Sequence, residues 1–551
     1  MLAKRGKFVV AEPLFRRGER IALRPRDKKG AGPGDMVLVG QGKQGARVVR
    51  KLGSPEVARD VVEALMLDRG LRRQFPRAVS ESEVEPIAAK RRDLTDLPTF
   101  TIDPNDAKDF DDAISVEGDR LWVHIADVSA FVRPGSALDD EALRRGTSTY
   151  VPGAVEPMLP ESISNEACSL KPEVVRPVVS VEMEMSAGGD VRSVSFHRAE
   201  IRSDARLTYE QVDRIFAGPG KAQAPWGEPL MRARKIAQAL ADKRTGALEV
   251  NSTEPSFEFD GRGNVAAVGR EVQTESHRLI EHLMILANEQ VAAYLAERRV
   301  PTLYRVHEKP DPPAVEWMLQ RLQSLGIPTP PAPKNMSPQQ AGDVAAAASS
   351  LIAEHVRRTG QGSRALPVMV LRALKPAYYG PKNLGHAGLA SPRYCHFTSP
   401  IRRYPDLVVH RALLASLGLD DAAPRADQMP DTGEHASAME REAMVIERDA
   451  DDVCLSFLLE RTLREREPSE PFAGEIVGVI GAGVFVEFGE EGFEGMLPVR
   501  RMRGDYFVLN QEETGLVGER TGRALRLGDP IEVVVDRVDA PRGRVDLVEP
   551  D

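Results

Sequence analysis

The sequence predicts a multidomain α+β protein in which a central mixed α/β region lies between two small β-rich units. Short apolar strands separated by glycine-rich turns fill residues 7–52 and reappear after Pro468, whereas residues 98–466 combine strands with long amphipathic helices. The chain has 551 residues, which is too long for one hydrophobic core at about 100–200 residues per domain. We therefore expect several domains.

Composition narrows the class of protein. Hydrophobic residues make up 42% and charged residues 28% of the chain, which is typical of a folded globular protein. The net charge of -9 argues against a protein that coats duplex nucleic acid with its whole surface, but it allows a strand to enter a local basic channel. Cys168, Cys395 and Cys454 lie far apart without a Cys-x-x-Cys pair, which excludes a zinc ribbon and favours the reducing cytoplasm. No apolar run approaches the roughly 20 residues of a membrane helix, so we expect a soluble cytoplasmic monomer.

The N-terminal unit, residues 1–54, contains four short strand-like segments, and we expect a small OB-like barrel. Residues 55–97 follow as a helical linker, because Pro55 suits the first turn of a helix that reaches Leu71. The string Gly40-Gln-Gly42-Lys-Gln-Gly45 fits a dinucleotide-binding fingerprint, but a strand rather than a helix follows it. We interpret it as a hairpin turn and expect no nucleotide cofactor, since no Walker-type string occurs either.

The central region, residues 98–466, begins with strands such as TFTI and LWVHIADVS. Leu279, Leu283 and Leu286 recur near helical spacing and predict a helix from about Glu275 to Arg298, which Pro301 follows. The polar stretch 420–436 is interpreted as a surface loop, and a charged helix is expected over roughly 437–466.

The C-terminal unit, residues 467–551, has five alternating strands in about 80 residues, which predicts a second OB barrel. Phe485 and Phe488 lie an odd number of residues apart on one strand, so they point to opposite faces. One of them is expected to fill the core and the other to face a ligand.

An acidic loop carries the strongest chemical signal. Five aspartates fall within residues 103–112, between two apolar strands, and Phe110 lies among them. Carboxylates this close raise one another's pKa unless a cation neutralises them. A solvated acidic turn is the alternative, but the flanking strands and Phe110 favour a buried bend. An EF-hand does not fit, because it would require glycine at Lys108 and glutamate at Ile114. The loop therefore predicts a Mg²⁺ site, with Mn²⁺ as the alternative.

The loop DPNDAKDFDDA strongly resembles the signature of the RNB family of exoribonucleases, the ribonuclease II and ribonuclease R type. Five further segments resemble family blocks in the family's order: STYVPG (148–153), MLPESISNEACSL (158–170), ESHRLIEHLMILAN (275–288), LYRVHEKP (303–310) and YCHFTSPIRRYPDLVVHR (394–411). Because these blocks span most of residues 98–465, the resemblance identifies this region as an RNB catalytic domain.

The resemblance implies a metal site and its catalytic partners. The aspartates that match the family's Mg²⁺ ligands are Asp103, Asp109, Asp111 and Asp112. Asp111 matches the aspartate most closely tied to catalysis. Arg402 matches the catalytic arginine, whose guanidinium can meet two phosphoryl oxygens in the transition state, although the adjacent Arg403 is a rival.

The resemblance also implies RNA contacts. Tyr150 matches a tyrosine that stacks on a base, an interaction that ignores base identity. Glu281 matches a glutamate that contacts the bound nucleotide, and His396 and Thr398 are expected near the strand at Arg402. A second aromatic that completes the family's base clamp has no counterpart around Glu249-Val250. The C-terminal unit resembles the OB-type module first described in a large ribosomal protein, so Phe485 is expected to stack on RNA. The N-terminal unit, residues 1–54, resembles a cold-shock-type barrel.

Together these features predict a processive, metal-dependent 3′-to-5′ exoribonuclease that degrades single-stranded RNA to nucleoside 5′-monophosphates. The alternative is a catalytically inactive RNA-binding regulator on the same scaffold, although such a protein should have lost ligand aspartates or Arg402. A metal-dependent endonuclease is a further alternative, which the lengths of the products would separate.

Overall fold

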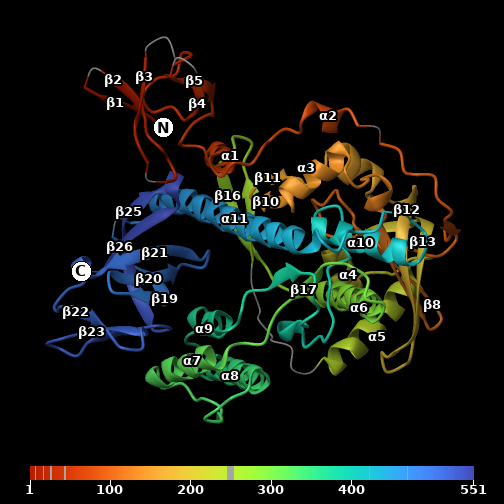
Figure 1. Ribbon diagram of the computed structural model, residues 1–551. Coiled ribbons are helices and arrows are strands. Elements are labelled where there is room, and N and C mark those ends of the chain that lie inside the picture. The colour runs from red at the N-terminus through yellow and green to blue at the C-terminus, as the bar shows by residue number, and fades with distance from the viewer. Residues whose placement is uncertain are drawn as a thin grey trace.

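The computed structural model describes residues 1–551 except 7, 17, 25–27, 43–44, 83, 245–253, 421, 468 and 551. The N-terminal strands and the C-terminal barrel lie at the same end of the molecule, and the long helix α11 (Met429–Glu465) leads from the central region to the barrel (Figure 1). Arg542 Nε donates a 2.7 Å hydrogen bond to the carbonyl of Leu14, so the two terminal units touch directly.

The N-terminal unit consists of a three-stranded antiparallel sheet and a hairpin that share one small core. The sheet contains β1 (Leu2–Arg5), β2 (Phe8–Ala11) and β3 (Ile21–Leu23), and the hairpin contains β4 (Val37–Gly42) and β5 (Gly45–Lys51). Leu2, Leu23 and Val48 meet in the core. Gly42 pairs with Gly45 in the antiparallel β4–β5 ladder, so a strand rather than a helix follows the glycine-rich string, as predicted. Closure of these strands into an OB-like barrel stays a prediction.

The linker helix α1 is shorter than predicted. It runs over Ala58–Asp68 rather than from Pro55 to Leu71, and its buried face packs against α11. Val57 occupies the N-cap, so the three residues from Pro55 stay outside the helix.

A seven-stranded mixed sheet forms the centre of the molecule. Its order is β14 (Ala205–Thr208), β7 (Phe100–Asp103), β8 (Asp112–Glu117), β9 (Arg120–Ala126), β12 (Val175–Met185), β13 (Val191–Arg202) and β6 (Arg92–Asp93). The short strands β10 (Thr149–Val151) and β11 (Ala154–Glu156) form a separate hairpin beyond α3 (Ala137–Arg145). The acidic loop joins β7 to β8, the second and third strands in this order.

Helices cover the sheet. α4 (Tyr209–Phe216), α5 (Gly227–Lys243), α6 (Glu275–Glu297) and α10 (Tyr404–Ser416) share a core with the sheet strands. The structure confirms the helix predicted from about Glu275. A separate core lies among α7 (Pro312–Ser324), α8 (Pro338–Thr359) and α9 (Ala365–Ala373).

The last helix, α11, is longer than predicted and spans Met429–Glu465. The interpretation of residues 420–436 as a loop was therefore wrong from Met429 onward. Pro430 lies in the first turn, where a missing N–H costs nothing, so the helix can begin there despite the polar sequence. Gly146, with φ of 68°, lets α11 approach closely, because a Cβ there would lie 2.7 Å from Met439 Cβ.

The C-terminal unit is a closed barrel, as predicted. Its strands follow the order β19 (Phe472–Ile480), β20 (Gly483–Phe488), β21 (Phe493–Pro498), β26 (Arg544–Val548) and β25 (Pro530–Asp539). A small sheet of β22 (Phe507–Leu509), β23 (Gly515–Gly518) and β24 (Ala524–Arg526) is inserted between β21 and β25.

Candidate active site

The acidic loop is held by hydrogen bonds from two other segments, at Ser169 and at Ala126. Ser169 Oγ accepts from the N–H of Phe110 at 3.1 Å and donates to the carbonyl of Lys108 at 2.7 Å. The N–H of Ala126 donates to the carbonyl of Asp111 at 2.9 Å. Phe110 is buried, as the sequence predicted. The end of the loop at Phe110 and Asp111 is thus buried, whereas Pro104, Asn105 and Asp106 are exposed.

Its carboxylates oppose one another's ionisation. Burial raises the pKa of Asp103 to about 7, and the charge of Asp112 adds to the shift. Burial raises the pKa of Asp112 to about 6 and that of Asp111 well above its usual range, although Arg402 acts against both shifts. Such a cluster is unfavourable at neutral pH unless positive charge is added.

The aspartates suit a hard divalent cation in charge and ligand type. Asp103 Oδ2 is buried without a hydrogen-bond partner, and carboxylate oxygen is the ligand that Mg²⁺ prefers. Throughout the described parts of the chain, no three His, Cys, Asp or Glu side chains converge closely enough to coordinate one ion as they stand. A metal at this loop therefore belongs to the proposal below.

Arg402 and Arg403 have different partners. Arg402 Nε lies 3.8 Å from Asp111 Oδ2, and 46% of the Arg402 side chain is exposed. Arg403 instead makes two hydrogen bonds to Asp406, of 2.9 and 2.7 Å. Asp406 is fully buried, so Arg403 neutralises a structural carboxylate while Arg402 faces the acidic loop. The geometry therefore favours Arg402 over Arg403 as the arginine of the candidate active site.

Tyr150 reaches the same loop from β10. Its hydroxyl donates a 3.0 Å hydrogen bond to Asp109 Oδ2, and its own N–H donates to Glu447 Oε1 on α11 at 2.8 Å. Burial and the charge of Asp109 raise the pKa of the Tyr150 hydroxyl. The neighbouring Ser148 N–H donates to the carbonyl of Arg402 at 2.9 Å, so the tyrosine and arginine segments are tied together.

His396 and Thr398 precede Arg402 in a buried segment. His396 Nδ1 shares a 2.8 Å hydrogen bond with the Tyr379 hydroxyl, and the His396 pKa is lowered by burial and by neighbouring arginines, Arg403 first. Thr398 is buried. Both residues therefore belong to the same segment of chain that leads into Arg402.

Glu281 and Phe485 make their contacts elsewhere. Glu281 is exposed on α6 and accepts a hydrogen bond from Gln273. Phe488 is fully buried in the barrel, whereas Phe485 is half-buried and lines a cavity of about 280 Å³ between α11 and the barrel. Phe488 is thus the core member of the pair. The position expected for a second clamp aromatic, Glu249-Val250, lies outside the described residues.

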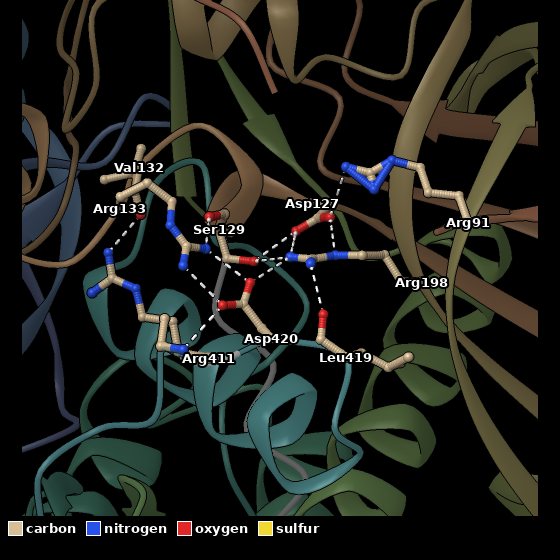
Figure 2. Close-up of polar contacts among 10 residues, drawn as sticks. Arg91, Asp127, Ser129, Val132, Arg133, Arg198, Arg411, Leu419 and Asp420 are labelled. Atoms are coloured by element: carbon tan, nitrogen blue, oxygen red, sulfur yellow. Dashed lines mark hydrogen bonds and ion pairs between the residues drawn. The ribbon is translucent and has the colours of Figure 1, made fainter. Parts of the chain in front are cut away.

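Figure 2 shows a buried ion cluster that connects the sheet to the far end of α10. Arg198 Nε donates to Asp127 Oδ2 at 2.8 Å, and Arg198 Nη2 donates to Asp420 Oδ2 at 3.0 Å. Two further hydrogen bonds of 2.8 Å join Arg133 to Asp420. Burial alone would raise the pKa of Asp420, but the arginines and an N–H donor hold it below its usual range. Asp127 follows β9, so the cluster positions α10, the helix that begins just after Arg402.

Some residues of the site had no recognisable signal in the sequence. The N–H of Ile401 donates to Asp111 Oδ1 at 2.9 Å, and Glu447 binds the backbone of Tyr150. A main-chain N–H donor cannot be recognised from the type of residue, and the sequence does not distinguish Glu447 from other charged residues on a polar helix. Only the folded chain brings these groups to the loop.

Comparisons with known proteins agree over most of the chain. The model for the RNB domain matches residues 91–418, and the model for the S1 RNA binding domain matches residues 467–548. Ribonuclease R of Aquifex aeolicus is 35% identical over 520 residues, which cover 91% of this chain and 72% of that protein. Ribonuclease R of Escherichia coli is 36% identical over 492 residues, 85% of this chain and 58% of that protein. The chain thus spans little more than half the length of the second relative.

Solved structures show the same architecture. The apo form of Mycoplasma genitalium RNase R superposes with a TM-score of 0.87 at 26% identity, covering 98% of this chain and 88% of that one. The same enzyme in complex with ribose methylated single-stranded RNA gives a TM-score of 0.86 at 25% identity, with the same coverage of both chains.

Among the described helices, none is both long and apolar enough to cross a membrane.

Proposed function

This chain belongs to the RNB family, and we propose that it is a processive 3′-to-5′ exoribonuclease that hydrolyses single-stranded RNA to nucleoside 5′-monophosphates. One observation carries the proposal. The exposed guanidinium of Arg402 faces the buried carboxylate of Asp111, 3.8 Å from Nε to Oδ2. The direction of digestion and the product are what the family resemblance implies, and the relatives named ribonuclease R support that assignment.

The metal is part of the same proposal. Its ligands would be Asp103, Asp109, Asp111 and Asp112, with Mg²⁺ as the ion and Mn²⁺ as a substitute. Held by these residues, the ion would supply activation of water and neutralisation of charge on the leaving oxygen. The unpartnered Oδ2 of Asp103 and the raised pKa values of the aspartates support this role for the loop.

The chain's own residues supply orientation and charge. The Ile401 N–H fixes Asp111 Oδ1, which leaves Oδ2 on the side of Arg402, where the attacked phosphate would lie. Arg402 can donate to two phosphoryl oxygens as negative charge accumulates on them. The Tyr150 hydroxyl is held by Asp109, so its ring can receive the base of the terminal nucleotide by stacking.

The flanking parts support the same function. We propose that the C-terminal barrel binds RNA through the half-buried Phe485, and that Glu281, His396 and Thr398 contact the strand.

The protein would act as a cytoplasmic monomer. Cys168, Cys395 and Cys454 are all buried with free thiols, which suits a reducing compartment.

An inactive RNA-binding regulator is disfavoured, because the four aspartates and Arg402 are all present. The decisive experiment follows 5′-end-labelled single-stranded RNA at one-nucleotide resolution, with and without EDTA. Progressive shortening from the 3′ end with release of mononucleotides, abolished by EDTA and restored by Mg²⁺, is the expected result. Internal fragments would indicate an endonuclease, and intact bound RNA would indicate a regulator.

A further inference from the structure

An exposed methionine lies on the face of α11 that borders the candidate active site. Met444 is 61% exposed, which is high for a large apolar side chain on a helix whose neighbouring Ala443 and Ile446 are buried. Solitary exposed apolar residues need no explanation, but apolar residues that gather beside a site often bind a ligand. The surroundings of Met444 therefore decide its role.

Helical spacing places Met444 in a row of residues that contact the site. Ser437, Glu440, Met444 and Glu447 are separated by three or four positions, so they project from one face of α11. The row's other members are engaged. Ser437 Oγ accepts from the Tyr379 N–H at 2.8 Å, Glu440 is paired with Arg305, and Glu447 accepts from the Tyr150 N–H.

Both neighbours of Met444 in this row, Glu440 and Glu447, contact residues that are bonded to the site, because the Tyr379 hydroxyl donates to Glu440 Oε1 at 3.5 Å and the Tyr150 N–H donates to Glu447. Tyr379 is bonded to His396 of the arginine block, and Tyr150 is bonded to Asp109 of the acidic loop. Met444 lies between these two attachments with its side chain uncovered. Glu440 is neutralised by Arg305 and one oxygen of Glu447 accepts from a backbone N–H, so the exposed thioether of Met444 is the apolar group that this row offers to RNA.

The strand pair beside α11 adds two more exposed apolar side chains. Tyr150 and Val155 are directly opposite each other in the β10–β11 hairpin, so they share a face, and they are 40% and 44% exposed. β10 packs against α11, as Figure 1 shows. Met444 precedes Glu447, which binds the Tyr150 backbone, by three positions, so helical spacing places it on the side of α11 that faces this hairpin. We call the exposed side chains of Tyr150, Val155 and Met444 the base platform.

We propose that Met444 is a substrate-contacting residue whose thioether packs against a nucleobase held at Tyr150, so that the base platform binds the 3′-terminal bases of single-stranded RNA. This inference rests on the proposed nuclease function and specifies how that site holds its substrate. A thioether is polarizable, flexible and favourable against an aromatic ring, and it discriminates little between bases. Those properties suit an enzyme that must advance along any sequence.

The test compares three variants with the wild type on single-stranded RNA. Met444→Ala removes the contact, Met444→Leu keeps an apolar side chain of similar size, and Val445→Ala truncates an exposed neighbour about 100° around the helix. We expect Met444→Ala to raise KM by about 3- to 10-fold while kcat stays within about twofold. Met444→Leu and Val445→Ala should match the wild type within about twofold.

A second readout does not depend on turnover. In an Asp111→Asn background, RNA carrying 2-aminopurine at its 3′ end should bind with the fluorophore quenched by stacking, and Met444→Ala should reduce both quenching and affinity. Equal KM, quenching and end-product length for Met444→Ala and Val445→Ala would overturn the role of Met444. If the wild type releases no mononucleotides at all, the nuclease proposal itself fails, so the two failures are distinguishable.

Discussion

The main-chain N–H of Ile401 donates a 2.9 Å hydrogen bond to Oδ1 of Asp111, across 290 positions of sequence. This bond attaches the arginine block to the acidic loop, because Arg402 is the next residue. It fixes one oxygen of the buried carboxylate and leaves the other opposite the Arg402 guanidinium. The position of the Arg402 guanidinium relative to the Asp111 carboxylate depends on that hydrogen bond.

Substitutions of the two adjacent arginines should have different effects, one on catalysis and the other on stability. Arg402→Lys should lower kcat by about 100-fold with little change in stability, because a lysine cannot donate to two phosphoryl oxygens at once. Arg403→Ala should instead lower the free energy of unfolding by about 3–5 kcal/mol, since it leaves buried Asp406 unpaired. Steady-state kinetics and urea denaturation of both variants test the division; equal losses of stability would contradict it.

Tyr150 should contribute through its ring more than through its hydroxyl. Tyr150→Phe removes the bond to Asp109 but keeps a stacking surface, so KM should rise only a few-fold. Tyr150→Ala should weaken RNA binding by about 1–3 kcal/mol and lengthen the shortest product. Product lengths on a sequencing gel and RNA titrations report both effects. Similar products from the two variants would show that the hydroxyl, and not the ring, matters.

The buried ion cluster should stabilise the fold without being needed for RNA contact. Asp420→Ala leaves Arg198 and Arg133 without their shared carboxylate, and it should cost about 3–5 kcal/mol of unfolding free energy. Asp427→Ala is the matched control, because the Asp427–Arg425 pair is exposed and should contribute less than about 1 kcal/mol. A shift in thermal midpoint that is as small for Asp420→Ala as for Asp427→Ala would refute the assigned role of the cluster.

His124 should make the fold sensitive to acid. Its ring is buried between Ser180 Oγ, at 2.8 Å, and Ser115 Oγ, at 3.1 Å, and burial lowers its pKa to about 3. The unfolded chain binds a proton near pH 6.5 while the folded chain does not, so stability falls as the pH decreases from 6.5 toward 3. Between pH 7 and 4.5 the wild type should lose about 2 kcal/mol more than His124→Gln. Parallel pH profiles for the two proteins would exclude this contribution.

Local patterns in the sequence predicted those features of the fold that depend only on residues near one another in the chain. The apolar spacing of Leu279, Leu283 and Leu286 led to α6, and Phe110 among the aspartates indicated that this end of the loop is buried, as the structure confirms. The odd spacing of Phe485 and Phe488 required opposite faces, and Phe488 proves to be the one in the core.

What the sequence could not supply depends on contacts between distant segments. Glu447 reaches Tyr150 across 297 positions, and nothing in the local sequence of α11 marks it. The start of α11 at Met429 was missed because a polar, proline-containing stretch resembles a loop until packing against the core stabilises it as a helix. The choice between Arg402 and Arg403 likewise needed the position of Asp406.

Asp111→Asn tests the central claim most directly, because it removes one negative charge while it preserves the size of the side chain. The measurement is mononucleotide release from end-labelled single-stranded RNA in Mg²⁺, alongside the affinity for the same RNA. We predict that release falls by at least about 1,000-fold while the dissociation constant changes only a few-fold. Turnover close to that of the wild type would contradict the assignment of the acidic loop as the catalytic centre.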